Sequence, residues 1–504
     1  MAAIDTNCDL LVIGGGINGA GIARDAAGRG LRTVLVEQGD FGGATSSAST
    51  KLIHGGLRYL EYFAYRLVAE SLAEREVLLR IAPHIVSPLT FVMPHVSTLR
   101  PAWMIRAGLW LYDHIGGGRS LPGSRGVALR AGGYGAGLKP ELSRGFLYSD
   151  ARVDDARLVI LNLRSAVEHG ASVMPRTRLV RAVREQGRWR ATLEAVRDGR
   201  RFELGARVLV NAAGPWVRKV IESTGGPIEK AGLRLVKGSH IVVPRIHPGE
   251  HAYLLQNTDR RVVFMIPWQE AYTLIGTTDV TVRTIAEAQA IDEEETRYLL
   301  DAVNRYLLRP LSGRDVVWSY TGVRPLYDDG KSDPAAVTRD YTLVTDERDG
   351  AVQLAVFGGK LTTYRRLAET VLDRLSPWLA DRRGPWTHDE ALPGGAFDSA
   401  AREATSQRLC ARYPGLPDAL VRRLFGRYGL SVTDVLADAR SLDDLGTDFG
   451  GGLYRREAEH AIAHEWAMTA DDILWRRTKC GLGMSPAQRE RFAAWFDGTL
   501  EAAA

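Results

Sequence analysis

Three glycines near the N-terminus have the spacing of a phosphate-binding turn. Gly14, Gly16 and Gly19 follow the pattern G-x-G-x-x-G, which allows a tight turn, close approach to a pyrophosphate and close helix–strand packing. Residues 9–13 form an apolar run before them, and the small residues after them have helical spacing, so the N–H groups of a helix N-terminus would face the phosphates. Glu37 ends the next apolar run, where a carboxylate can accept hydrogen bonds from ribose hydroxyls. Together these features predict a dinucleotide site on a βαβ unit.

A second candidate stretch, residues 46–63, reads SSASTKLIHGGLRYLEYF. It combines hydroxyl groups, a lysine, a histidine, a glycine pair, an arginine and a tyrosine in one turn-rich segment. A loop that only joined two elements would not need these residue types. Ser46 and Ser47 have no evident partners for a catalytic triad, so we expect them to hydrogen-bond a phosphate or to cap a turn.

Two later turns favour FAD over NAD as the dinucleotide. Ala213 and Gly214 follow an apolar run and suit a contact with the adenosine half of the cofactor. Gly358 and Gly359 precede a helix that we expect to begin near Leu361. The N-terminus of that helix would face the flavin ring, which carries negative charge when it is reduced. A nicotinamide cofactor would not need this contact, although the second turn alone also fits an ordinary helix start.

The elements that must position these residues form more than one domain. A chain of 504 residues suggests two or three domains. Strand-like runs alternate with turns between residues 235 and 280, and the composition after residue 390 is helical and charged. We predict an α/β FAD-binding Rossmann-like fold, of the glutathione-reductase and D-amino-acid-oxidase type, with an inserted, mostly antiparallel β substrate domain and an all-α C-terminal domain. The expected segments are FAD-binding at 1–85, 151–225 and 316–390, substrate or cap at 86–150, substrate domain at 226–315, and helical domain at 391–504.

The overall composition excludes several classes of protein. The net charge of +5 is a mild basic excess, and without an RNP-type, zinc-finger or long basic motif it does not favour nucleic-acid binding. Cys8, Cys410 and Cys480 are few and far apart, which fits a reducing compartment and argues against a disulfide framework or zinc cluster. His460 and His464 lack the H-E-x-x-H order, so we predict no metal site. We expect no signal peptide and no membrane span, so any membrane contact would be peripheral.

A series of motifs resembles the FAD-dependent (aerobic, respiratory) glycerol-3-phosphate dehydrogenases. In order they are VIGGGINGAGIARDAAGRG, ATSSASTKLIHGGLRYLE, NAAGPWV, KGSHIVVP, IPW, IGTTD, GVRPL, TRDY and FGGKLTTYR. The likeness covers about residues 8–375 and continues more loosely through 464–482. It implies oxidation of sn-glycerol 3-phosphate to dihydroxyacetone phosphate by hydride transfer to non-covalent FAD. It also implies that a homodimer at the inner face of the cytoplasmic membrane passes the electrons to ubiquinone or menaquinone.

The resemblance also implies a set of site residues. Arg58, Arg339 and Lys360 would bind mainly the substrate phosphate, with help from Tyr59, although each alone would equally suit a surface ion pair. The residues expected to hold FAD are Gly14, Gly16, Asn18, Gly19, Glu37, Ser46, Ser47, Thr50, Lys51, His54, Gly55, Gly56, Ala213, Gly214, Gly358, Gly359, Leu361 and Thr362.

The group that accepts the hydroxyl proton stays open between candidates. His240 is the natural base by its ordinary pKa, but a structural histidine on a strand is a serious alternative. The resemblance also makes Arg324 a candidate base, yet a guanidinium stays protonated, so we prefer it as a stabiliser of the developing alkoxide. His54 is a third possibility, and we expect it rather to shape the loop near the flavin.

Residues 99–119, LRPAWMIRAGLWLYDHIGGGR, are the best candidate for membrane contact. Aromatic rings alternate there with arginines, as in segments that lie in the headgroup region. A core or dimer-contact helix is an equal alternative on sequence alone, and the resemblance favours the membrane. Alternative functions are a glycerol-3-phosphate oxidase that uses oxygen, an amine or amino-acid oxidase of the same fold, and a non-catalytic flavin-binding membrane adaptor.

Overall fold

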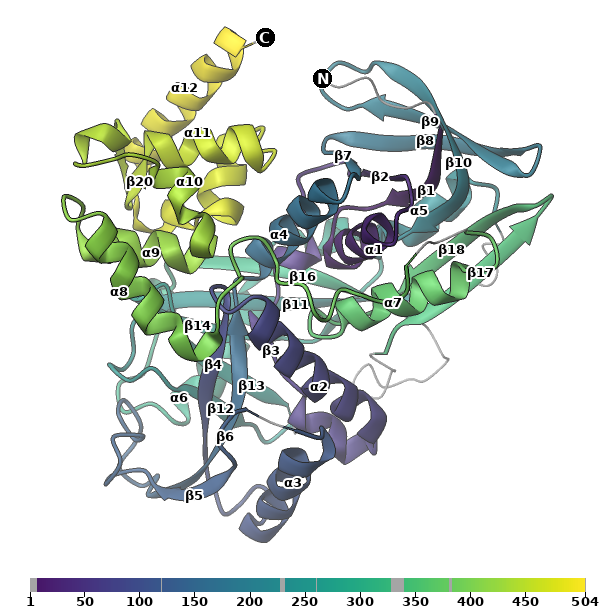
Figure 1. The fold of residues 1–504 in the computed structure, drawn as a ribbon. Coiled ribbons are helices and arrows are strands. Elements are labelled where there is room, and N and C mark those ends of the chain that lie inside the picture. The colour runs from purple at the N-terminus through teal and green to yellow at the C-terminus, as the bar shows by residue number, and fades with distance from the viewer. Residues whose placement is uncertain are drawn as a thin grey trace.

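The computed structural model describes residues 7–118, 120–226, 232–259, 261–327, 340–379 and 383–503. Figure 1 shows two sheets that meet along one side, with the C-terminal helices packed beside both of them. All three cysteines are buried. No helix in the described part of the chain is both long and apolar enough to cross a bilayer.

The first sheet is the nucleotide-binding sheet, with the strand order β17-β18-β10-β1-β2-β7. Its strands are β1 (Asn7–Ile13), β2 (Thr33–Val36), β7 (Ser172–Met174), β8 (Thr177–Glu185), β9 (Arg188–Ala195), β10 (Arg201–Asn211), β17 (Thr342–Arg348) and β18 (Ala351–Phe357). From β18 to β7 the neighbouring strands are parallel, while β17, β8 and β9 pair antiparallel. Parallel strands are buried on both faces, which explains the continuous apolar runs in β1 and β18.

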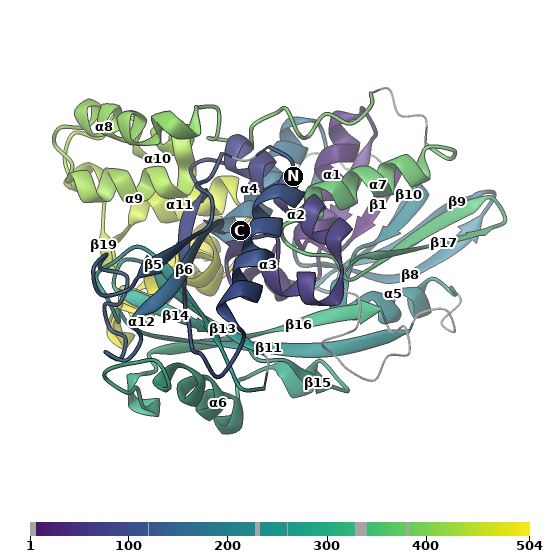
Figure 2. The same ribbon diagram turned by 90° about the horizontal axis from the view of Figure 1, so that it is seen from below.

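The second sheet is almost entirely antiparallel and has the order β15-β11-β14-β13-β12-β4-β6-β3, with β16 beside β11 and β5 beside β6. Its strands are β3 (Leu52–Ile53), β4 (Val86–Pro94), β5 (Arg125–Ala128), β6 (Arg144–Val153), β11 (Leu233–Pro244), β12 (Ala252–Gln256), β13 (Val262–Trp268), β14 (Tyr272–Gly276), β15 (Val280–Val282) and β16 (Trp318–Tyr327). Figure 2 shows β11 and β16 as long paired strands with α6 on the outside. The predicted boundary at residue 316 would group β16 with the nucleotide-binding segment, whereas its pairing places it in this sheet.

Helices cover both sheets. The helices before the C-terminal domain are α1 (Ile17–Gly28), α2 (Tyr65–Ile81), α3 (Ala102–Ile115), α4 (Asp155–Glu168), α5 (Val217–Ser223), α6 (Glu293–Asn304) and α7 (Tyr364–Leu375). Helix α1 is the crossover between β1 and β2, and it packs against α4 and α7. Helix α7 begins at Tyr364, three residues after the expected start, because residues 361–363 form a turn closed by a hydrogen bond from the Thr363 N–H to the Lys360 carbonyl.

The C-terminal domain is helical and docks through buried ion pairs. Its elements are α8 (Arg402–Arg412), α9 (Asp418–Tyr428), α10 (Val432–Leu436), β19 (Asp448–Gly450), β20 (Leu453–Tyr454), α11 (Arg455–His464), the π-helical turn η10 (Asp472–Arg477) and α12 (Pro486–Ala503). Arg157 on α4 pairs with Glu465, and both side chains are fully buried. Breaking such a pair would leave an uncompensated buried charge. The pair therefore fixes the position of the C-terminal domain against the first sheet and its helices.

Candidate functional site

A cavity of about 1180 Å³ lies between the two sheets. The loops after β1, β2, β10 and β18 line one part of it, at the carboxyl ends of the parallel strands, where ligands bind in open α/β sheets. Residues of β11, β12, β13 and β16 from the second sheet line the other part. The cavity therefore joins a nucleotide-binding edge to an antiparallel wall.

The glycine turn between β1 and α1 has no room for side chains. Gly14 has φ +112°, and a Cβ there would lie 2.6 Å from the carbonyl oxygen of Ala212. A Cβ on Gly19 would collide with the carbonyl of Gly14, so the close approach of helix and strand depends on this glycine. Gly16 is the N-cap of α1 and lines the cavity. The geometry matches the expected phosphate turn, with Gly19 acting in packing behind it.

Glu37 fixes the edge of the cavity at the end of β2. Its two carboxylate oxygens accept hydrogen bonds from the N–H groups of Gly15 and Gly39, both at 2.7 Å. Burial raises the pKa of the Glu37 carboxyl, and the two N–H donors act in the opposite direction. The side chain thus ties together the two loops that surround the expected ribose.

Replacing Glu37 with glutamine should weaken FAD binding by on the order of ten- to a hundredfold, because an amide NH2 leaves one buried N–H unpaired, at about 1–3 kcal/mol. The substitution keeps the side-chain shape, so the fold should survive. The flavin-to-protein absorbance ratio after gel filtration, and titration of the apoprotein with FAD, measure the effect. Unchanged FAD affinity in Glu37→Gln would show that the carboxylate does not organise the site.

Further contacts close the cavity around the turn. The Ser46 hydroxyl accepts a hydrogen bond from the first N–H of α1, on Ile17, at 2.9 Å. The Asn18 amide donates to the carbonyl of Gly358 at 3.1 Å, while its Oδ1 atom is buried without a partner among the described residues. Gly358 and Gly359 have φ values of +75° and +98°, which suit glycine alone. The long cavity, the glycine turns and the unpaired Asn18 oxygen fit FAD.

A cationic cluster lines the part of the cavity near the second sheet. Arg324 on β16 forms an ion pair with Asp279, and Arg58 lies 4.0 Å from the other oxygen of the same carboxylate. The Lys360 ammonium lies 4.0 Å from the centre of the Tyr59 ring. Arg58, Arg324 and Lys360 all line the cavity, so this cluster suits a doubly charged anion such as a phosphate monoester.

His240 lies beside this cluster on β11 and is 1% exposed. Its Nε2 atom is 3.0 Å from the Thr50 hydroxyl, and its ring stacks on Tyr320 at 4.8 Å. Burial, with smaller effects from Arg324 and Lys51, lowers the pKa of His240 well below its usual value. The imidazole is therefore neutral at physiological pH. Its Nδ1 atom is buried with no hydrogen-bond partner in the described part of the chain.

Most of the predicted site residues come together in this one cavity. Those that line it are Gly14, Gly16, Asn18, Glu37, Ser46, Thr50, His54, Gly56, Arg58, Tyr59, Ala213, Gly214, His240, Arg324, Gly358, Gly359, Lys360, Leu361 and Thr362. Arg339 lies outside the described residues.

Four predicted cofactor residues do not reach the cavity wall: Gly19, Ser47, Lys51 and Gly55. The Lys51 ammonium is instead buried on both oxygens of Asp155, at 2.9 Å each. The Gly55 N–H donates to the Tyr112 hydroxyl at 2.8 Å, which ties this loop to α3. Gly55 and Lys51 thus hold this segment in place without lining the cavity.

Several lining residues have no role in the sequence prediction. Asp279 is the last residue of the quoted IGTTD motif, which is its sequence signal, whereas its contacts with Arg58 and Arg324 arise only in the folded chain. Gly276 does not line the cavity, but it must lack a side chain, since a Cβ there would collide with the His240 ring. Arg176 and Arg476 come from segments far apart in sequence and have no local signal.

The two C-terminal histidines lie on α11 with ring centroids 4.8 Å apart. His460 is buried against Tyr428, whereas His464 lies at the end of the helix. Within the described ranges, no group of three or more His, Cys, Asp or Glu side chains could hold a metal ion.

Comparison with known proteins gives concordant matches. Residues 9–365 match the family described as FAD dependent oxidoreductase, and residues 385–494 match the C-terminal domain of alpha-glycerophosphate oxidase. The aerobic glycerol-3-phosphate dehydrogenase of Escherichia coli (strain K12) is 50% identical, with 97% of each chain covered. The D-erythritol 1-phosphate dehydrogenase of Brucella abortus (strain 2308) is also 50% identical, covering 97% of this chain and 98% of that protein.

Among solved structures, the glycerol-3-phosphate dehydrogenase from Bacillus halodurans complexed with FAD has a TM-score of 0.73 and 26% identity. The alignment covers 99% of this chain and 95% of that one. These matches confirm the predicted fold and the FAD cofactor.

Proposed function

Because the chain belongs to the family of FAD-dependent glycerol-3-phosphate dehydrogenases, we propose that it oxidises sn-glycerol 3-phosphate at C2 to dihydroxyacetone phosphate. When bound, FAD accepts the hydride that leaves C2. The observation that carries the proposal is the cationic cluster of Arg58, Arg324 and Lys360 beside the neutral His240 in the FAD cavity.

Each residue of the cluster has a distinct part in this proposal. Arg58 and Lys360, with the Tyr59 hydroxyl, bind the phosphate, and Arg339 joins them by its place in the TRDY motif. His240 takes the proton of the C2 hydroxyl, because a neutral imidazole has a lone pair to accept it. Arg324 stabilises the negative charge that develops on that oxygen. Asp279 holds the Arg324 guanidinium in place through their ion pair.

A longer polyol phosphate is the second candidate substrate. The D-erythritol 1-phosphate dehydrogenase is as similar to this chain as the Escherichia coli enzyme, at 50% identity. Both substrates carry a phosphate and a secondary alcohol, so the cationic cluster suits either. Steady-state kcat/KM values for the two phosphates, with unphosphorylated glycerol and glycine as controls, test the proposal. Comparable turnover of glycine would instead support an amino-acid oxidase of the same fold.

Membrane quinone is the electron acceptor that the cavity suits best. Apolar side chains of α3 (Met104, Leu111) and of the second sheet (Leu254, Val262, Phe264) are among the residues that line the cavity. Met104 is also 39% exposed, so this part of the lining reaches the protein surface. Apolar lining of this kind suits a hydrophobic quinone better than a charged carrier. Anaerobic turnover with a quinone analogue, compared with the peroxide yield in air, separates this acceptor from oxygen.

Helix α3 has one face buried in the protein and one exposed aromatic face that suits contact with a membrane surface. Ile105, Leu109 and Tyr112 are buried in the core, whereas Trp103 and Trp110 are 73% and 59% exposed. The segment η2 (Leu57–Tyr62) packs against α3, and next to it Tyr62, Phe63 and Tyr65 are also exposed. Exposed aromatic residues at one edge favour contact with a membrane surface, and the family resemblance makes the inner face of the cytoplasmic membrane the proposed place of action. The family resemblance also supports a homodimer, which light scattering of the purified protein would test.

Replacing both Trp103 and Trp110 with serine should release the protein from membranes. Burial of a large apolar side chain contributes about 1.5–3 kcal/mol, so losing two should lower vesicle partitioning by about a hundredfold or more. Co-sedimentation with anionic phospholipid vesicles measures the change. Leu308→Ser is the matched control, because Leu308 is 59% exposed and lies outside α3. Equal partitioning of the double variant and the wild type would exclude α3 as the contact.

A further inference from the structure

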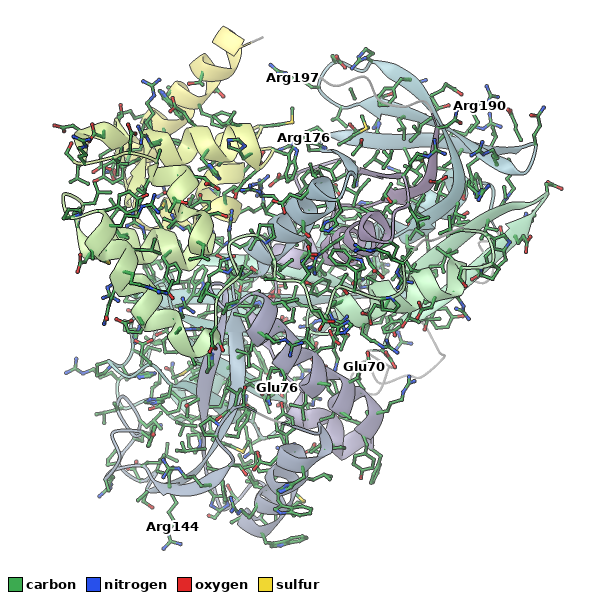
Figure 3. The ribbon with its side chains drawn as sticks, in the orientation of Figure 1. Glu70, Glu76, Arg144, Arg176, Arg190 and Arg197 are labelled. Carbon is green, nitrogen blue, oxygen red and sulfur yellow. The ribbon has the colours of Figure 1, made fainter. Side chains whose placement is uncertain are left out.

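The C-terminal domain contributes one side chain to the cavity that the first sheet forms. Arg476, in the π-helical turn η10, lines the same cavity as Glu37, Gly39 and Asp40. Single π-helical turns are frequently found at functional sites. Figure 3 labels Arg176, which also lines this part of the cavity, where the nucleotide-binding domain faces the C-terminal helices.

Two carboxylates hold the guanidinium of Arg476 at this position. Its Nε atom forms an ion pair with Asp40, and its Nη2 atom pairs with Asp472. Arg477 donates to both oxygens of Asp40, at 2.6 and 2.8 Å, and is fully buried. Arg176 donates to Asp472 at 3.0 Å. Both carboxylates are shared between two arginines, which fixes the geometry of the whole group.

This group has spare positive charge and spare donors. Three guanidinium groups face two carboxylates, so one positive charge is not balanced within the group. The Nη1 atom of Arg476 has no hydrogen-bond partner among the described residues. Arg477 serves the docking of the domain, whereas Arg476 is 18% exposed and faces the cavity. Arg476 therefore keeps a donor that a ligand in the cavity can reach.

We propose that Arg476 is part of the FAD site, with its free nitrogen directed at the adenosine half of the cofactor. That half lies next to Glu37, whose predicted partner is the ribose, and adenosine offers oxygen and nitrogen acceptors and a ring face on which a guanidinium stacks. The C-terminal domain thereby closes the cofactor site, so FAD retention depends on the docking of this domain. The inference rests on the FAD cofactor and is independent of which polyol phosphate is the substrate.

Arg476→Ala should raise the dissociation constant of FAD about tenfold or more, because a charge-assisted hydrogen bond is lost. Titration of the full-length apoprotein with FAD, followed by flavin fluorescence, measures it. Arg455→Ala is the matched control, since it removes an arginine of the same domain that pairs with Glu459 at 2.7 Å and does not line the cavity. An FAD affinity in Arg476→Ala equal to that of the control would overturn the proposal.

Amide hydrogen exchange of the wild-type protein tests the same contact and does not depend on how well Arg476→Ala folds. In the wild-type protein, FAD should slow amide hydrogen exchange of η10 as well as of residues 14–19, because a ligand that contacts both segments stabilises both. Protection of residues 14–19 without any protection of Asp472–Arg477 would contradict a contact between the cofactor and the C-terminal domain.

Discussion

Arg324→Ala is expected to lower kcat/KM for glycerol 3-phosphate by on the order of a thousandfold or more. Loss of one donor to a developing oxyanion typically costs about 10²–10³ in kcat. The substitution also leaves the Asp279 carboxylate without its nearest ion-pair partner in the cationic cluster, so its charge would repel the substrate phosphate. Both kcat and KM should therefore change, while the flavin content should stay that of the wild type.

Two further variants separate the two effects at Arg324. Arg324→Lys keeps the charge but not the forked geometry, so KM should recover more than kcat. In the double variant Arg324→Ala/Asp279→Asn the repelling carboxylate is gone, so KM should fall relative to the single variant. Steady-state kinetics with flavin-normalised protein measures both parameters. An Arg324→Ala enzyme with kcat within threefold of wild type would remove Arg324 from the chemistry.

His240→Asn should lower kcat by about 10²–10⁴, the usual contribution of a positioned general base. Asparagine is smaller and keeps a polar group near Thr50, so the strand and the flavin site should survive. His54→Asn is the comparison, because the His54 ring packs edge-on against Phe264 and its backbone bonds Thr362. We expect His54→Asn to change kcat far less. Comparable loss in both variants would show that neither histidine has a special part in proton transfer.

The pH profile adds a test of the same assignment. Burial lowers the pKa of His240, and Arg324 and Lys51 lower it further, so the base form persists below the usual histidine range. The wild-type kcat should therefore show no loss of activity around pH 6.5 that is due to this group. Removing Arg324 should raise the pKa of His240 and shift any acidic decline of kcat upward. A wild-type decline centred near pH 6.5 that vanishes in His240→Asn would contradict a depressed pKa.

The sequence predicted the nucleotide-binding turn because its determinants are local. Gly14, Gly16, Gly19 and Glu37 all lie in one βαβ unit, where glycine spacing and strand ends translate directly into geometry. The turn at Gly358 and Gly359 could be predicted for the same reason, because the positive φ values of these two residues are a local property of a turn. Local sequence patterns also singled out residues 99–119, by their alternation of aromatic residues and arginines, as the candidate for membrane contact.

Contacts between distant segments could not be predicted in this way. Asp40 and Arg477 are far apart in sequence and meet only because the C-terminal domain docks on the first sheet. Asp279 reaches Arg324 because β15 and β16 both pair with β11. Lys51 has the residue type of a phosphate ligand, yet the fold buries its ammonium on Asp155. In all three cases the partner of the side chain is set by the tertiary fold, and residue type and local spacing do not reveal it.

Anaerobic reduction of the bound flavin tests the central claim most directly. On mixing the holoprotein with glycerol 3-phosphate in the absence of oxygen, the visible absorption of oxidised flavin should bleach within the first turnover. Unphosphorylated glycerol and glycine should leave it unchanged, and Arg324→Ala should bleach far more slowly. A flavin that stays oxidised with glycerol 3-phosphate but bleaches with an amino acid would contradict the account.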